Sequence, residues 1–393
     1  MKNILLSSAR DIIDRSSLER RLRSKKKLRV KFGVDPSSPD LHLGHYVILK
    51  QLDTFARFGH KVIFLVGDFT AQIGDPSGRK TERPVLSPEQ VKKNVKTYID
   101  QVSLVLDTTK IEIRYNSEWY KKMVLAEWLE IMAKFSANYI FERDDFSKRI
   151  KSGLSLGMHE TMYPIMQAYD SIVLKADVEL GGADQRFNIL AGRSLQKKMG
   201  VEPQDVITFD LLVGTDGKRK MSKSLGNYIG FTDTPEDMFG KIMSIPDELT
   251  AMYADLILNK KVSALKKAIG SGHPMEVKKQ LALEIVSIFH KGNEEVARAH
   301  FERIFSAREL PAAKPFSCKC TTVLQAILFV EKEQSSSNVR RLAQQGGIKV
   351  NGKPISLDEL NSAIAKGDII SIGRRKSYIL KWKNTPNKKL QNL

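Results

Sequence analysis

The segment that decides the fold class runs over residues 28–66 and reads LRVKFGVDPSSPDLHLGHYVILKQLDTFARFGHKVIFLV. Its apolar pattern predicts a strand over 28–34, a helix over about 43–58 and a buried strand over 62–66, with a loop of Asp, Pro and Ser after the first strand. Strand, helix and strand in this order form a βαβ unit. We therefore expect an α/β fold with a parallel sheet, helices on both faces and ligands beyond the carboxyl ends of the strands.

The rest of the chain extends this organisation. A second apolar strand near 178–180 runs directly into Gly181-Gly182-Ala183-Asp184-Gln185. A long, mainly helical stretch at about 88–165 looks inserted between the two halves, and further helices are predicted over 256–269 and 275–291. The predicted division is an α/β domain over residues 1–245, an α-helical domain over 246–315 that ends in a linker rich in Pro and Ala, and a small α+β domain over 316–393.

The composition indicates a soluble protein of two or three domains. The chain has 393 residues, of which 41% are hydrophobic and 28% are charged, and this excludes a disordered protein. Its apolar runs are only strand-length, which excludes a membrane-spanning helix, and the N-terminus lacks the apolar region of a signal peptide. Cys318 and Cys320 can form neither a disulfide framework nor a four-cysteine metal site, and they have no evident role. We expect a cytoplasmic protein with no membrane partner.

Positive charge is concentrated near the C-terminus. The formal net charge is +19, and residues 314–393 hold 15 basic and 5 acidic residues; the run 374–389 has seven basic residues and no acidic one. Such a run taken alone is often a solvated tail. Because about a fifth of the chain carries over half of the excess, we favour a polyanionic partner such as nucleic acid.

The first motif with chemical content is His42-Leu43-Gly44-His45, where the loop after the first strand turns into a helix. Two imidazoles and the free amides of the helix N-terminus point at one position there, and this suits a phosphate. Two histidines three residues apart are also compatible with metal ligands or with capping residues. The motif alone therefore does not decide the function.

The second motif, Lys220-Met221-Ser222-Lys223-Ser224, lies in a hydrophilic loop over residues 214–228. Gly214, Gly217 and Gly226 flank it and suit a mobile arm. A surface loop rich in Lys and Ser is the structural alternative. However, ammonium and hydroxyl donors are the groups that a triphosphate requires when charge moves from its α-phosphorus onto leaving pyrophosphate.

Together the two motifs, in this order and about 175 residues apart, resemble the signatures of class I aminoacyl-tRNA synthetases. Three further runs resemble the bacterial tyrosyl-tRNA synthetase family: Gly74-Asp75-Pro76-Ser77-Gly78, Tyr163-Pro164-Ile165-Met166-Gln167-Ala168-Tyr169-Asp170, and the residues 181–185 quoted above. The resemblance covers nearly the whole chain. It implies a Rossmann-type catalytic domain, a helical domain on the anticodon side and a C-terminal S4-like RNA-binding domain.

The resemblance implies that tyrosine binds along one face of a helix. Pro164 suits the first turn of that helix, so that Tyr163, Gln167 and Asp170 fall at i, i+4 and i+7, although an exposed polar stripe would show the same spacing. In the family the position of Asp170 binds the substrate phenol, and a buried acceptor there rejects an analogue that lacks the hydroxyl. The implied tyrosine-binding residues are Asp35, Asp75, Tyr163, Gln167, Asp170 and Gln185.

The ATP end of the site is implied in the same way. The catalytic residues would be His42, His45, Lys220 and Lys223, which stabilise charge on the phosphates; no nucleophile or general base is needed, because the tyrosine carboxylate is already ionised. Mg²⁺ would offset part of the charge, with no protein-ligated metal. The implied ATP-binding residues are Gly44, Gly182, Asp184, Lys220, Met221, Ser222, Lys223 and Ser224.

One position departs from the better-known branch of the family. That branch has a Tyr that donates to the substrate phenol where this chain has Lys31. The run from Lys31 to Pro36 and the uninterrupted Lys-Met-Ser-Lys-Ser motif are similar to a second bacterial branch that lacks this Tyr. The second phenol contact is therefore unassigned, and tryptophan is the alternative substrate, since its synthetase shares the architecture.

Residues 337–353 resemble an S4 RNA-binding domain. Adjacent arginines on a short helix and a Gly-Gly turn before a strand suit phosphate contact, although a helix-Gly-strand pattern is common. The implied RNA-binding residues are Arg340, Arg341, Lys349 and Lys353. The expected partners are tRNA(Tyr), L-tyrosine and a second copy of the chain, because the segment that contains Tyr115-Asn116-Ser117-Glu118-Trp119 corresponds to the region through which the family dimerises.

Two interpretations of a different class stay open. The chain could be an RNA-binding protein that keeps a synthetase body without catalysis, against which the intact His45 and Lys223 argue. It could also be a nucleotidyltransferase acting on a small metabolite, which would not need the basic C-terminal module. Formation of an aminoacyl-adenylate discriminates among them.

Overall fold

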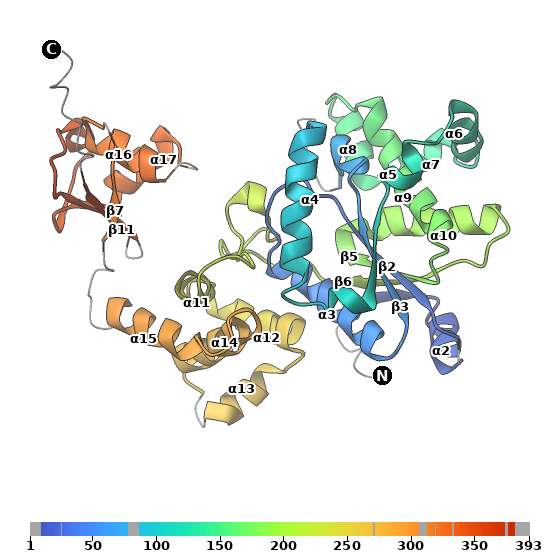
Figure 1. Cartoon of the computed structure of the whole chain (residues 1–393), viewed down its shortest axis with the longest axis horizontal. Coiled ribbons are helices and arrows are strands. Elements are labelled where there is room, and N and C mark those ends of the chain that lie inside the picture. Colours follow the sequence, from blue (N-terminus) through green and yellow to red (C-terminus); the bar gives the residue numbers. More distant parts are fainter. Residues whose placement is uncertain are drawn as a thin grey trace, which may run out of the picture. The chain divides into compact units, whose positions relative to one another are not determined.

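The computed structural model describes residues 9–24, 26–77, 86–269, 272–305, 313–318, 320–331, 334–373 and 376–381. The chain divides into two compact units, Met1–Glu294 and Glu295–Leu393, and Figure 1 shows the helices and strands of each. The boundary predicted at residue 245 lies inside the first unit. The division into three domains stays a prediction.

The first unit is built on a six-stranded sheet with the order β1-β6-β5-β2-β3-β4. The strands are β1 (Ala9–Ile13), β2 (Arg29–Val34), β3 (Lys61–Val66), β4 (Ile111–Tyr115), β5 (Val178–Gly182) and β6 (Asp205–Phe209). All neighbours pair in parallel except β1, which pairs antiparallel with β6. In the centre of the sheet, Val30 lies opposite Val62 on one side and Val178 on the other. The predicted α/β fold with a mainly parallel sheet is confirmed.

The strand order places the ligand crevice. From β2 the chain moves through β3 to the edge strand β4, whereas from β5 it moves the opposite way to β6. The direction of winding therefore reverses between β2 and β5. In open parallel sheets the crevice outside the carboxyl ends of two such strands is where ligands bind.

Helices connect and cover these strands (Figure 1). Those of the α/β part are α2 (Arg15–Arg23), α3 (Leu43–Arg57), α4 (Pro88–Val102), α5 (Ser117–Tyr120), α6 (Leu125–Met132), α7 (Ala137–Phe141), α8 (Asp144–Lys151), α9 (Met158–Val173) and α10 (Arg186–Lys198). Helix α3 buries Leu49, Leu52 and Phe55 completely and packs against β2, β3 and β5, while α10 packs against α9, β5 and β6. Among the described residues, no helix combines the length and the apolar character that crossing a bilayer requires.

The stretch 88–165 is mainly helical, as predicted, but it is not wholly an insertion. It contains β4, a strand of the main sheet, so that α4 and β4 continue the winding and only the helices after β4 are inserted. The sequence of β4, Ile111-Glu112-Ile113-Arg114-Tyr115, carries charges because β4 is an edge strand and is only half-buried. The strand was missed because β4 has no apolar run of the kind that predicted the other strands.

Helix α9 begins earlier than predicted. It starts at Met158, so Pro164 lies inside the helix and not in its first turn. Tyr163, Gln167 and Asp170 still lie along one helix face, because the helix continues through Val173.

The helical segment of the first unit consists of α11 (Pro235–Met243), α12 (Thr250–Leu258), α13 (Val262–Ile269) and α14 (Pro274–Phe289), and α14 packs against the other three. The single helix predicted over 256–269 is wrong. Asn259 has a left-handed backbone (φ 54°) that ends α12. Lys50 of α3 donates to Asn259 Oδ1 (2.6 Å) and to the Ile257 carbonyl (3.2 Å), which ties this end of α12 to α3.

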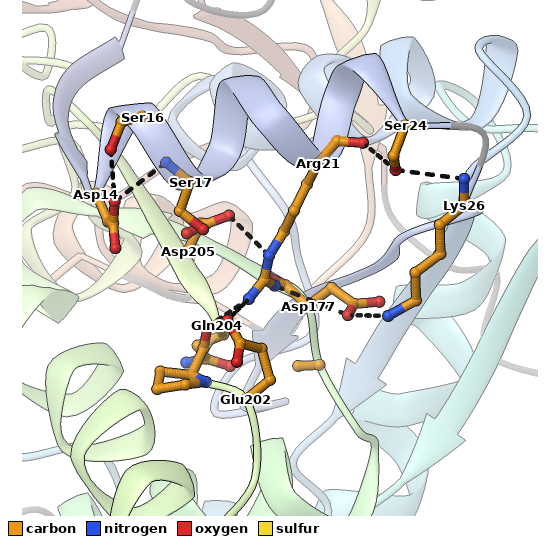
Figure 2. A network of polar contacts seen from close by, with 12 residues as sticks. Asp14, Ser16, Ser17, Arg21, Ser24, Lys26, Asp177, Glu202, Gln204 and Asp205 are labelled. Carbon is orange, nitrogen blue, oxygen red and sulfur yellow. Dashed lines mark hydrogen bonds and ion pairs between the residues drawn. The ribbon is translucent and has the colours of Figure 1, made fainter.

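A polar network fixes α2 to the amino ends of β5 and β6, and Figure 2 shows it from close by. Arg21 donates to the carbonyls of Asp177 (2.7 Å) and Pro203 (2.8 Å), and its Nε lies 3.5 Å from a carboxylate oxygen of Asp205. Burial raises the pKa of Asp205 to about 6, although Arg21 acts in the opposite direction. This network lies at the end of the sheet opposite to the predicted ligand crevice.

The second unit is a small α+β domain. Its elements are α15 (Glu294–Phe305), β7 (Lys314–Phe316), α16 (Val323–Val330), α17 (Ser336–Gln344), β8 (Ile348–Val350), β9 (Lys353–Pro354), β10 (Ile369–Ile372) and β11 (Lys376–Leu380), and its sheet has the order β7-β11-β10-β8-β9. Ile327, Val339 and Ile348 are fully buried in its core. Cys318 and Cys320 form a disulfide with each other, a pairing that was not predicted.

Candidate active site

A cavity of about 480 Å³ lies where the winding of the sheet reverses. Its walls come from the loop after β2, the N-terminus of α3, one face of α9, the turn after β5 and the loop at 220–224. Every residue that was predicted to bind ATP or tyrosine lines this cavity. Segments of the chain nearly 200 residues apart in sequence therefore meet at one site of the size that a small ligand needs.

The two imidazoles of the first motif lie at the N-terminus of α3. His42 is the N-cap residue, its backbone N–H donates to Nδ1 of His45 (3.2 Å), and the ring centroids are 4.1 Å apart. A Cβ on Gly44 would lie 3.0 Å from the His42 ring, so glycine is what allows this close packing. Because Nδ1 of His45 accepts, its proton resides on Nε2, which stays available as a donor.

Both imidazoles are neutral at pH 7. Burial lowers the pKa of His45 to about 4, and burial, with electrostatic contributions from the adjacent His45 ring and from Lys220, lowers the pKa of His42 well below 6.5. Within the part of the chain that the structure describes, Nδ1 of His42 is buried without a hydrogen-bond partner. Such an atom is costly in the free protein and is a natural contact for a bound ligand.

The loop that carries the second motif is held by short contacts. The Met221 backbone N–H donates to the Leu212 carbonyl (2.7 Å), and the Ser222 N–H donates to Oδ1 of Asn227 (2.9 Å). A Cβ on Gly214 would lie 2.3 Å from Nδ2 of Asn227. Gly214 is therefore required by the packing of Asn227, a reason that differs from the mobility suggested by the sequence.

Both lysines of this motif are paired with carboxylates at the cavity. Lys220 donates to Oδ2 of Asp184 (2.6 Å) and Lys223 to Oδ2 of Asp40 (2.6 Å). All four side chains keep between about a fifth and two fifths of their exposure, so water and ligands reach them. A phosphate group can replace either carboxylate, since both offer negatively charged oxygens to the ammonium.

Acidic and amide groups gather at the amino-acid end of the cavity. The Tyr163 hydroxyl donates to Oδ2 of Asp35 (2.9 Å), and Nε2 of Gln185 donates to Oδ2 of Asp75 (2.6 Å). Burial, with the charges of Asp35 and Asp75, raises the pKa of Tyr163 well above 10, so Tyr163 stays a neutral donor. Two carboxylates with few cations beside them suit a ligand ammonium group.

Asp170 lies deep in the cavity, 3% exposed. Its Oδ1 accepts from the indole N–H of Trp119 (3.0 Å). Burial raises the pKa of Asp170 to about 7, against the opposing charge of Lys31 and against hydrogen bonds that include that of Trp119. A deeply buried acidic acceptor suits a ligand hydroxyl group.

Two residues near Asp170, Asn116 and Trp119, were predicted to lie elsewhere. Asn116 and Trp119 were expected in a region of dimer contact, but Asn116 is fully buried and Trp119 nearly so. Asn116 donates to the Thr70 hydroxyl (2.9 Å) and accepts from the Phe69 backbone (2.9 Å). Both residues follow the carboxyl end of β4, so recognising that edge strand would have placed them at the site.

All four predicted RNA-binding residues belong to the second unit. Arg340 and Arg341 are exposed on α17, Lys349 is half-buried on β8, and Lys353 is exposed on β9, which pairs with β8. Most of the basic run 374–389 lies outside the described residues. In the described ranges no cluster of three or more His, Cys, Asp or Glu side chains could hold a metal ion.

Comparison with known proteins gives a consistent result. The family model described as tRNA synthetases class I (W and Y) matches residues 23–306. The chain is 45% identical over 373 residues to the tyrosine–tRNA ligase of Aquifex aeolicus, covering 94% of this chain and 95% of that ligase, and 42% identical over 383 residues to that of Thermotoga maritima, covering 95% and 96%. Among solved structures, the tyrosyl-tRNA synthetase of Archaeoglobus fulgidus in complex with L-tyrosine matches with a TM-score of 0.61 at 22% identity, over 76% of this chain and 97% of that one. At that identity the structural match supports the fold alone.

Proposed function

Since the chain belongs to the class I family of tryptophanyl- and tyrosyl-tRNA synthetases, we propose that its cavity activates tyrosine with ATP and that the tyrosyl group then passes to tRNA. The products of the first step are tyrosyl-adenylate and pyrophosphate. In the second step the adenylate gives its acyl group to the terminal ribose of tRNA(Tyr).

The observation that carries the choice of tyrosine is the position of Asp170. Its buried carboxylate accepts from the indole N–H of Trp119, with Tyr120 and Asn116 as further neutral hydrogen-bonding groups beside it, and a phenolic hydroxyl would be a further donor to it. Phenylalanine would leave this acceptor desolvated and short of a partner, which costs about 1 to 3 kcal/mol or more for a charged group. The indole of tryptophan is larger than a phenol and does not carry its N–H at the position of the phenol hydroxyl, so tryptophan fits the space around Asp170 less well.

The other end of the tyrosine substrate meets the acidic groups. Asp75 and Gln167 would hold the α-ammonium together with Tyr163, whose hydroxyl is already oriented by Asp35 at 2.9 Å. Gln185, fixed by Asp75, would position the carboxylate. This orientation directs the substrate carboxylate toward the α-phosphorus of ATP.

The adenylation step would need positioning and charge stabilisation only. The tyrosine carboxylate is ionised at neutral pH and attacks the α-phosphorus in line, and pyrophosphate leaves with the bonding electrons. His42 and His45 would donate to the phosphates, while Lys220 and Lys223 would exchange their carboxylate partners for phosphate oxygens. Each well-placed donor of this kind is worth about 3 to 4 kcal/mol. Mg²⁺ would enter as part of the MgATP substrate and offset charge on the phosphates.

The turn after β5 would hold the ribose of ATP. Asp184 accepts a hydroxyl hydrogen readily once Lys220 has moved to the phosphates. Gly182 and Gly44 would allow the nucleotide to lie against the backbone, since a Cβ on Gly182 would meet Asp184 and Leu211 at 2.8 Å. Transfer to tRNA would use the exposed cations of α17 and the β8–β9 hairpin as phosphate contacts.

We propose that the chain works as a homodimer in the cytoplasm. Large apolar side chains are exposed on and beside α6 to α9, with Leu125 71% and Met158 66% exposed. The others are Val124, Leu129, Phe141, Ile150 and Leu154. Exposed apolar surface gathered on one group of helices is typical of a protein contact.

The test is amino-acid-dependent exchange of labelled pyrophosphate into ATP with tyrosine, phenylalanine or tryptophan, together with Asp170→Ala. We expect exchange with tyrosine alone and its loss in Asp170→Ala. Exchange with tryptophan would reassign the substrate. Exchange with no amino acid would overturn the proposed activity.

A further inference from the structure

Lys31 is a fully buried cation at the tyrosine end of the cavity. Its ammonium lies 3.0 Å from Oε1 of Glu179, and it donates to the Ser171 hydroxyl (2.9 Å) and to the Gln167 carbonyl (3.2 Å). A lysine ammonium has three N–H donors. Three acceptors already surround this one, so no donor is left for a substrate hydroxyl.

Glu179 on β5 is equally well satisfied. Its oxygens accept from Ser171 (2.8 Å), from Nε2 of Gln167 (3.3 Å) and from Nε2 of Gln204. The ion pair therefore holds Gln167 twice, through its carbonyl and through its side-chain amide. It connects β2, β5 and the turn of α9 that also carries Asp170.

We propose that Lys31 is a positioning residue for tyrosine recognition: with Glu179 it fixes Gln167, and its buried positive charge, which has no donor left for the substrate, stabilises the negative charge of Asp170, the acceptor of the substrate phenol. The inference rests on the proposed function, because it concerns how the same pocket recognises tyrosine. Lys31 occupies the position where the better-known branch of the family has a Tyr that donates to the phenol. In this chain a buried charge that does not contact the phenol takes the place of that hydrogen bond.

The charge balance around Asp170 supports this role. The cation that acts on Asp170 is Lys31 on β2, which is paired with Glu179 on β5. The neutral hydrogen-bonding groups that face Asp170 are Tyr120, Trp119 and Asn116. Tyr163 on α9 is a neutral neighbour, beyond which lie the carboxylates of Asp35 and Asp75. Burial alone favours the protonated acid, and the pKa of Asp170 is about 7 with Lys31 opposing that effect. Without Lys31 the protonated form would be favoured further, and a protonated carboxyl group accepts less strongly from a phenol.

The experiment measures the Kd of tyrosine by calorimetry between pH 5.5 and 9, without ATP, for the full chain and for Lys31→Met and Glu179→Gln. Removing the cation should move the acidic limb of the binding profile upward by at least one pH unit, and removing the anion should move it downward. For Lys31→Met at pH 7, a move of one pH unit lowers the ionised fraction of Asp170 from about a half to about a tenth, so tyrosine should bind about fivefold more weakly. Phenylalanine has no hydroxyl for Asp170 to bind, so its affinity should show no shift of the acidic limb. It should change only as far as either variant displaces Gln167, which would hold the α-ammonium of both amino acids.

Arg21→Met is the matched control, because it removes a partly buried cation paired with Asp205 in the network of Figure 2, away from the cavity. It should lower the free energy of unfolding without moving the acidic limb. The proposal is overturned if both pair variants shift the limb in the same direction or not at all, or if tyrosine and phenylalanine weaken equally. A direct phenol contact from Lys31 would instead weaken tyrosine at every pH with the limb unmoved, which also overturns it. Failure of the proposed function is distinct, because the unsubstituted chain would then show no tyrosine-dependent pyrophosphate exchange.

Discussion

Replacing Asp40 with Asn should increase the affinity of the site for ATP. In the free protein Lys223, which lines the cavity, donates to Asp40 at 2.6 Å, and Asp40 stands two residues before His42, another lining residue. An incoming phosphate must displace this carboxylate before Lys223 can bind it. Asp40→Asn removes the competing charge and leaves a side chain of the same size.

The size of the effect follows from the exposure of the pair. The two side chains are 23% and 26% exposed, so solvent screens their attraction considerably. An ion pair of this kind contributes about 0.2 to 1 kcal/mol, and the upper end applies here because both groups are more buried than exposed. About 1 kcal/mol corresponds to a factor of about five in a binding constant. The gain should shrink at high ionic strength, because salt already weakens the pair.

The assay is tyrosine-dependent pyrophosphate exchange with varied ATP. Asp40→Asn should lower the KM for ATP about fivefold, with KM for tyrosine unchanged. Asp53→Asn is the matched control: Asp53 is also about a quarter exposed and lies 2.6 Å from a cation, Arg57, but this cation, unlike Lys223, does not line the cavity. It removes the same formal charge and should leave the KM for ATP unaltered. An unchanged or raised KM in Asp40→Asn would show that the carboxylate does not compete with phosphate for Lys223.

Three further outcomes are expected. Burial lowers the pKa of His45 from 6.5 to about 4, so the folded state favours the neutral ring, and this contribution to stability is complete above pH 6.5 and is lost as the pH falls toward 4. In urea unfolding, the free energy of unfolding of His45→Gln should therefore gain about 3 kcal/mol relative to the unsubstituted chain over that range. A constant difference would contradict this expectation. Leu125→Glu places a charge on the first residue of α6, a leucine whose side chain is 71% exposed, and should convert a dimer into a monomer by light scattering. An unchanged mass would remove that surface from the interface. Arg340→Ala with Arg341→Ala should raise the KM for tRNA and reduce the salt dependence of transfer by up to two counterions, while pyrophosphate exchange keeps its rate; equal loss of both would indicate a folding defect.

The central part of the fold could be predicted because local signals and tertiary structure agree there. After Lys61 the strand at 61–66 is apolar on both faces, as a buried parallel strand usually is, and the strand at 29–34 is apolar on the face of Val30, Phe32 and Val34. The helix between them follows the 3.6-residue period. Strand β4 breaks this agreement, because an edge strand keeps charged residues on one side. The end of α12 at Asn259 was missed for another reason: a left-handed cap needs no glycine when the residue is Asn.

The predicted ATP- and tyrosine-binding residues share one cavity because topology brings their segments together: the loop after β2, the N-terminus of α3, the turn after β5, the loop at 220–224 and one face of α9. What the sequence could not indicate is which charges pair with which. Lys31 and Glu179 are 148 residues apart and meet only because β2 and β5 are neighbours across the reversal in winding. Asp40 was likewise invisible as a partner of Lys223, since their contact depends on where the loop at 220–224 lies.

These pairings have a common physical logic. A site for a triphosphate needs several positive groups, yet a pocket that held them unpaired would be unstable without its ligand. This chain meets the need in two ways: its imidazoles are neutral donors, and its two loop lysines are matched by Asp184 and Asp40. Binding of MgATP then exchanges carboxylate for phosphate and leaves the number of ion pairs nearly constant. The binding energy that is not consumed by this exchange can be expressed when negative charge moves onto the leaving pyrophosphate, which is where the reaction requires it.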